Sequence, residues 1–124
     1  MFEKKIKLGN LYAFYGSLLT EKQQEILRLY CIHDLSLGEI SENLDISRQA
    51  VYDTLKRSKK ILEDYEGKLG LLSKFSNTRN KVNQLIKSID SFRIIINDNL
   101  DRDKMLNKID EVKELLVEIL DEGL

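Results

Sequence analysis

The sequence predicts an all-α protein in which a helix-turn-helix domain is followed by a C-terminal pair of helices. The 124 residues contain no proline, whereas an average chain of this length has about six. Valine and threonine, which strands favour, are scarce. Leucine and isoleucine instead recur at intervals of three and four residues, the spacing of one helix face.

Two helices are expected in the first part of the chain. An apolar series that ends at Leu19 predicts a first helix over about residues 4 to 18. Thr20 and Gln23 then match a capping box, in which the hydroxyl accepts from a backbone N–H and the glutamine side chain reaches back to the N-cap. The second helix follows and ends near residues 33 and 34.

The third and fourth helices are separated by a turn of three residues. Ser36 and Glu39 match a second capping box, which opens a helix of only about eight residues. Asp45 can adopt a left-handed conformation at modest cost, and Ser47 is an N-cap for a fourth helix that runs to about Glu66. This succession is the helix-turn-helix arrangement. The apolar residues expected to lock its helices together are Ile40, Leu44, Ile46, Val51 and Leu55.

A domain boundary is expected at the end of the fourth helix. Glycine at positions 67 and 70 weakens the helix there. We therefore predict a helix-turn-helix domain over residues 1–66 and a C-terminal helical extension over residues 67–124.

The extension contains two amphipathic segments. Apolar residues over 71–96 predict a fifth helix, which the cluster Asn97–Asn99 ends. Asp101 and Asp103 favour a helix start, and the apolar steps over 105–119 predict a sixth helix. The apolar face of the sixth helix either closes the core over the fifth or pairs with the same helix of a second copy, which would give a homodimer.

Charge is almost balanced in total but uneven along the chain. The formal net charge is -1 and the pI is about 5.9, well below the pI above about 9 that is typical of nucleic-acid-binding domains. Residues 46–93 nevertheless hold 11 Lys and Arg against five Asp and Glu, whereas residues 98–124 hold four against nine. No apolar run reaches the roughly 18 residues of a membrane span, and the start MFEKKIKLGN lacks a signal-peptide core. We expect a cytoplasmic protein without membrane insertion.

No group of residues suits catalysis or metal binding. The single cysteine, Cys31, and the single histidine, His33, point in nearly opposite directions on a helix end. They fall short of the four ligands of a structural zinc site and form no activated nucleophile. The aromatic residues Tyr12, Phe14 and Tyr15 have helical spacing and are expected in the core. We expect a protein that is not an enzyme and that has no metal and no cofactor.

Polar side chains at the start of the fourth helix suit a recognition helix. In helix-turn-helix proteins these turns contact base edges, and basic residues further along contact phosphates. Asp53 lies within this surface, where its carboxylate either accepts from a cytosine amino group or repels the backbone. An ordinary helical hairpin with a solvated charged face is the alternative interpretation. The candidate nucleic-acid-binding residues are Ser47, Arg48, Gln49, Tyr52, Asp53, Lys56, Arg57, Lys59 and Lys60.

Several segments between about residues 10 and 70 carry a resemblance to a known family. They are Phe14–Gln23 (FYGSLLTEKQ), Ser36–Ile40 (SLGEI), Ser47–Asp53 (SRQAVYD), Lys56 with Arg57, and Lys60–Tyr65. They resemble the YlxM-like family of small bacterial helix-turn-helix proteins, whose motif is similar to region 4 of sigma factors, which reads promoter DNA. The genes of that family neighbour those of the signal recognition particle's protein and receptor, so the resemblance implies a role in the signal recognition particle pathway. It implies no catalytic residues, and it gives no pattern after Leu72.

Two functions compete on this basis. The first is a regulator that docks the helix beginning at Ser47 onto nucleic acid, with duplex DNA preferred to structured RNA. The second is a protein-binding adaptor of the signal recognition particle or its receptor, which uses the helix-turn-helix only as a scaffold. The acidic end of the chain and the low pI favour the second function.

Overall fold

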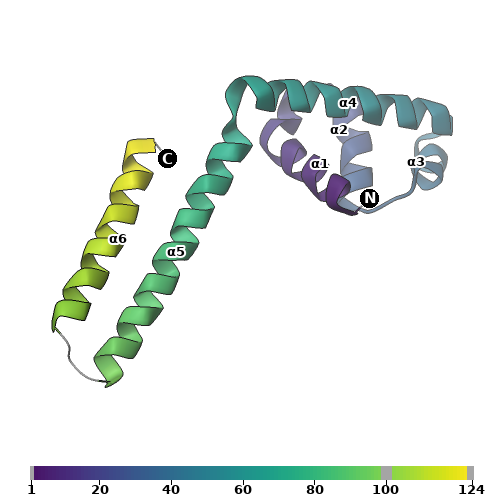
Figure 1. Cartoon of the computed structure of the whole chain (residues 1–124). Helices are drawn as coiled ribbons and strands as arrows, with labels where there is room; N and C mark the ends of the chain where they lie inside the picture. The colour runs from purple at the N-terminus through teal and green to yellow at the C-terminus, as the bar shows by residue number, and fades with distance from the viewer. Residues whose placement is uncertain (1, 99–101, 123–124) are drawn as a thin grey trace. The chain divides into compact units, whose positions relative to one another are not determined.

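The computed structural model of the chain describes residues 2–98 and 102–122, and the described residues form helices and no strand (Figure 1). The predicted all-α fold is confirmed. The chain divides into two compact units, of which the first ends at Leu72 and the second begins at Ser73. The elements are α1 (Phe2–Tyr15), the 3-10 turn η1 (Gly16–Leu18), α2 (Glu21–Leu27), the π turn η2 (Arg28–Ile32), α3 (Leu37–Leu44), α4 (Arg48–Leu69), α5 (Leu71–Asp98) and α6 (Arg102–Glu122).

Helix α4 is the centre of the first unit, because α1, α2 and α3 all pack against it. Its inner face buries Val51, Leu55, Ser58 and Leu62. Burial of the apolar residues of this row against three helices stabilises the unit. The other buried apolar side chains of this core are Leu8, Leu11, Tyr15, Leu19, Ile26, Leu27 and Ile40.

Both predicted capping boxes are present. Gln23 N donates to Thr20 Oγ1 at 3.3 Å, and Thr20 N donates to Gln23 Oε1 at 3.1 Å. Glu39 N donates to Ser36 Oγ at 3.1 Å, and Ser36 N donates to Glu39 Oε1 at 3.2 Å. Each pair satisfies backbone donors that a helix start leaves without an intrahelical partner. The sequence therefore fixes where α2 and α3 begin.

The second predicted helix ends at the expected place, but its last turn is not α-helical. Its last turn, η2, widens to π geometry and is followed by Asp34 in the left-handed region, with φ of 56°. Lys5 of α1 forms an ion pair with Asp34, and its ammonium lies 4.4 Å from the ring centroid of Tyr30. Contacts with α1 thus accompany a distortion that helical spacing alone does not predict.

Helix α4 extends three residues past its predicted end at Glu66. The helix passes through Gly67 and ends at Gly70, which takes a left-handed conformation with φ of 62°. A hydrogen-bonded group then caps the start of α5: Tyr15 OH donates to Glu66 Oε1 at 2.5 Å and accepts from Leu71 N at 3.0 Å. Burial raises the pKa of Tyr15, and the Glu66 carboxylate acts in the same direction. The first compact unit therefore continues past the predicted boundary at residue 66 to Leu72.

Helices α5 and α6 form an antiparallel hairpin in the second unit (Figure 1). Lys81 of α5 forms ion pairs with Glu118 and Glu122 of α6, and the Lys81 to Glu118 distance is 3.6 Å. Among the described residues of this unit, only Leu85, Ser88 and Ile119 are buried. Of the residues predicted to end the fifth helix and begin the sixth, Asn99 and Asp101 lie outside the described residues, and Asp103 lies in the first turn of α6.

The hydroxyl of Ser58 generates a prediction about stability. Ser58 is fully buried on the inner face of α4, and its Oγ has no hydrogen-bond partner in the described part of the chain. A buried hydroxyl without a partner costs about 1 kcal/mol or more. We expect Ser58→Ala to raise the free energy of unfolding by about 1 kcal/mol in urea denaturation. Ser58→Leu, which adds volume to a filled site, should lower it, and a loss of stability in Ser58→Ala would contradict the assignment.

Candidate nucleic-acid interface

Three hydrogen bonds hold the turn between α3 and α4, and Ser41 takes part in all of them. Asp45 has φ of 55° and ψ of 47°, so the predicted left-handed conformation is confirmed. The backbone N–H groups of Asp45 and Ile46 both donate to the carbonyl of Ser41, and Ser41 Oγ donates back to the carbonyl of Ile46. The predicted N-cap is also present, since Ala50 N donates to Ser47 Oγ at 3.0 Å. Local hydrogen bonds thus hold the turn between the two helices.

The interior of the motif matches the prediction. Ile40 and Val51 are fully buried, and Leu55 is buried beside them. Leu44 and Ile46 are half-buried and pack against the same core. The apolar set locks the two helices together, so the opposite face of α4 is presented to solvent.

All nine candidate binding residues lie exposed on or at the start of α4. Helical spacing puts five of them on the half of the helix opposite the buried row, and the other four, Ser47, Arg48, Tyr52 and Lys59, at its flanks. Between residues 47 and 60 this surface carries five Lys and Arg and a single acidic residue. At about 1.5 Å per residue it extends over roughly 18 Å. The sequence therefore predicted the position of this surface, which we call the α4 outer face.

Two of the candidate residues are bonded to each other. Gln49 Nε2 donates to Asp53 Oδ1 at 2.9 Å, one helical turn apart. The pair holds the amide and the carboxylate side by side on the α4 outer face. This interaction uses one Asp53 oxygen and leaves the other to accept from an incoming donor.

Arg48 lies against the start of α3. Its guanidinium nitrogens would come within 3.1 and 3.2 Å of a Cβ atom built on Gly38. Gly38 therefore leaves the space that the Arg48 side chain occupies, and a larger residue there would displace it. Sequence reasoning missed this contact, although a glycine inside the first turn of a capped helix is a usable signal.

The basic part of the α4 outer face is bounded by acids. Lys59 pairs with Glu63 at 3.9 Å, one turn on, and both side chains are about half exposed, so the pair adds little stability. In the described part of the chain no ion pair engages Lys56, Arg57 or Lys60. These three cations are available to bind phosphate oxygens.

The other residues considered from the sequence lie apart from this face. Cys31 is half-buried in η2, and burial raises the pKa of its thiol, which disfavours the reactive thiolate. Tyr15 is buried, and Tyr12 and Phe14 are half-buried against the core, as predicted. Within residues 2–98 and 102–122, no cluster of three or more His, Cys, Asp or Glu is placed to hold a metal ion. None of the helices described is long and apolar enough to cross a membrane.

Comparisons with known proteins agree over most of the chain. A family described as "UPF0122: Putative helix-turn-helix protein, YlxM / p13 like" matches residues 2–122. A UPF0122 protein of Halalkalibacterium halodurans is 49% identical over 90 residues, which are 73% of this chain and 83% of the relative. A UPF0122 protein of Thermoanaerobacter sp. is 55% identical over 83 residues, 67% of this chain and 71% of the relative. A UPF0122 protein of Bacillus thuringiensis is 52% identical over 85 residues, 68% and 77% of the two chains.

The left-handed turn gives the prediction of this subsection. An L-residue in this conformation costs roughly 1–2 kcal/mol, less for aspartate and nothing comparable for glycine. We expect Asp45→Gly to raise the free energy of unfolding by about 0.5 kcal/mol and Asp45→Val to lower it by about 2 kcal/mol, because β-branched residues tolerate positive φ least. Urea denaturation measures both. Equal stability of the glycine and valine variants would show that this backbone conformation is not what the turn depends on.

Proposed function

The chain belongs to the YlxM/p13-like family of helix-turn-helix proteins, and from this premise we propose that it is a cytoplasmic regulatory protein that binds duplex DNA through the α4 outer face. The observation that carries the proposal is the set of nine exposed polar and charged side chains on and at the start of a helix fixed by a capped turn. The function includes no catalysis. It extends to the signal recognition particle pathway, which the family resemblance implies.

The shape and charge of α4 support binding in a major groove. That groove is about 12 Å wide in B-DNA and admits one α-helix, whereas the deep and narrow major groove of RNA does not. With α4 in the groove, Arg48, Gln49 and Tyr52 in the first two turns are positioned for base edges. Lys56 and Lys60, further along the same face, are positioned for phosphates.

The Gln49–Asp53 pair would set part of the base preference. Asparagine and glutamine read adenine through two hydrogen bonds, and aspartate accepts from the amino group of cytosine. Because the two side chains are bonded to each other, a base that contacts one of them also meets the other. A homodimer through the C-terminal helices belongs to the same proposal, because one module of near-zero net charge offers few phosphate contacts.

The proposal predicts binding that depends steeply on salt. In a titration with mixed-sequence duplex DNA, the logarithm of the affinity should fall linearly with the logarithm of salt concentration. Arg48→Ala with Lys56→Ala should abolish binding at physiological salt. Lys7→Ala, which removes an exposed lysine of α1, is the matched control and should bind normally. An affinity for duplex DNA that does not change with salt concentration, or that the double variant retains, would contradict the proposal of DNA binding.

The adaptor function is the second candidate, and the charge of α6 favours it. Helix α6 holds seven Asp and Glu against four Lys and Arg, which suits a basic protein partner. If this function holds, the immobilised full chain should retain the signal recognition particle's protein or its receptor from cell extract after nuclease treatment. The Arg48→Ala, Lys56→Ala variant should retain it equally well. Loss of the protein partner on nuclease treatment, alongside clear retention of DNA, would decide for the first candidate.

A further inference from the structure

The α5–α6 hairpin has one face of uncovered apolar side chains. Eight large aliphatic residues on it are between 42% and 70% exposed. Only three side chains of the hairpin are buried, which is little to hold two long helices together in water. We call this surface the hairpin apolar face. Its residues are Val82, Ile86, Ile89, Ile96, Leu106, Ile109, Leu116 and Leu120.

These residues share a face because on both helices an exposed apolar residue precedes a buried one by three positions. On α5, Leu85 is turned toward α6, and Val82 precedes it by three residues. On α6, Ile119 is turned toward α5, and Leu116 precedes it by three residues. Because successive residues are 100° apart around a helix, a residue three positions earlier points about 60° to one side. Since the helices run antiparallel, the same turn brings both rows to the same side of the hairpin.

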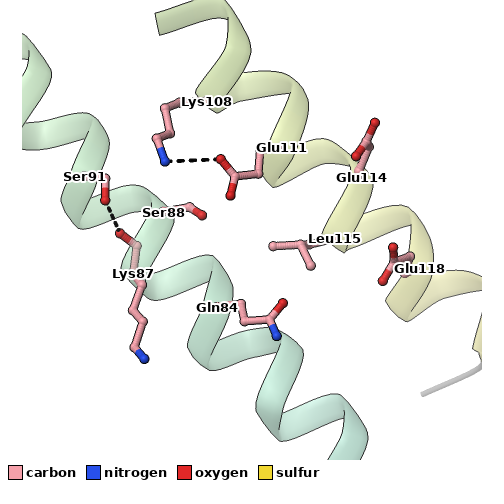
Figure 2. Close-up of a pocket in the computed structure, with 9 residues that line it drawn as sticks. All are labelled: Gln84, Lys87, Ser88, Ser91, Lys108, Glu111, Glu114, Leu115 and Glu118. Atoms are coloured by element: carbon pink, nitrogen blue, oxygen red, sulfur yellow. Dashed lines mark hydrogen bonds and ion pairs between the residues drawn. The ribbon is translucent and has the colours of Figure 1, made fainter. Parts of the chain in front are cut away.

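The opposite face of the hairpin is polar (Figure 2). There the two helices border a hollow of ≈ 370 Å³ lined mostly by charged and amide side chains. Lys108 donates to Glu111 at 3.2 Å on this side, and Leu115 is the one large apolar residue among those that line the hollow. The two faces are thus chemically distinct, and only one of them requires cover.

Two apolar rows on each helix are the pattern of a four-helix bundle. In such a bundle every helix packs against two neighbours, one along each row. In this hairpin α5 and α6 have only each other, so the second row of each is unfilled. We propose that a second copy of this chain covers the hairpin apolar face, and that the two hairpins form an antiparallel four-helix bundle. The assignment deepens the homodimer of the proposed function by naming the surface and the arrangement.

The area is sufficient for a stable dimer. Full burial of a Val, Leu or Ile side chain removes roughly 100 Å² from water. Eight side chains that are about half exposed would together bury roughly 800 Å² in a pair of copies. Because apolar atoms form about 65% of homodimer interfaces, the whole interface is about 1,200 Å², within the range of stable complexes.

Sedimentation equilibrium of the full chain without nucleic acid tests the proposal. The chain should sediment at twice its mass of 14.5 kDa. Ile89→Glu or Ile109→Glu should weaken the dimer roughly 100-fold, because each places two carboxylates in an apolar interface. Ile94→Glu is the matched control, an isoleucine of α5 that is 63% exposed and lies off the hairpin apolar face, and it should remain dimeric. Helical circular dichroism should be the same in all three variants.

A monomeric wild-type chain, or equal dimers of Ile89→Glu and Ile94→Glu, would overturn the proposal. Because no nucleic acid is present, these results are independent of whether the α4 outer face binds DNA.

Discussion

The buried face of α4 is the constraint on which the first unit depends. Three helices pack against this one row, so α4 cannot rotate without exposing Val51 and Leu62, which are fully buried. That fixed rotation decides which side chains are left outside. The basic and polar residues from Ser47 to Lys60 form a surface because the residues between them are held inside. The core and the candidate interface are therefore two faces of one helix, and a change to the first acts on the second.

Much of this could be predicted from the sequence because the signals are local. A capping box specifies a helix start within four residues, and Ser36 with Glu39 and Thr20 with Gln23 both form theirs. Asp45 was predicted in the left-handed region from its place between two capped helices, and it has φ of 55°. All of these depend on bonds between residues close in the chain, which a pattern can encode.

Contacts between distant residues could not be predicted. The end of α4 depends on Tyr15, whose hydroxyl bonds to Glu66 and to Leu71 at the start of α5, 51 and 56 residues further along the chain. No spacing rule indicated that Gly70 rather than Gly67 would end the helix, since both glycines weaken it equally. The same holds for Arg48, whose position over Gly38 depends on the crossing of α3 and α4. In each case the tertiary contact determined the outcome between local options of similar energy.

The second unit shows how a sequence pattern can be correct yet incomplete. The apolar spacing of three and four residues predicted the helices of the hairpin, but the spacing alone could not say which apolar row would be covered within one chain. In the structure Leu85 and Ile119 close the hairpin, while Ile89 and Ile109 are half exposed. A chain that needed only a hairpin would place polar residues in that second row, as it does on the polar face around Lys108 and Glu111. Retaining aliphatic residues there costs solubility unless another surface covers them. This cost is the physical reason to treat the hairpin as half of an assembly, whatever the α4 outer face binds.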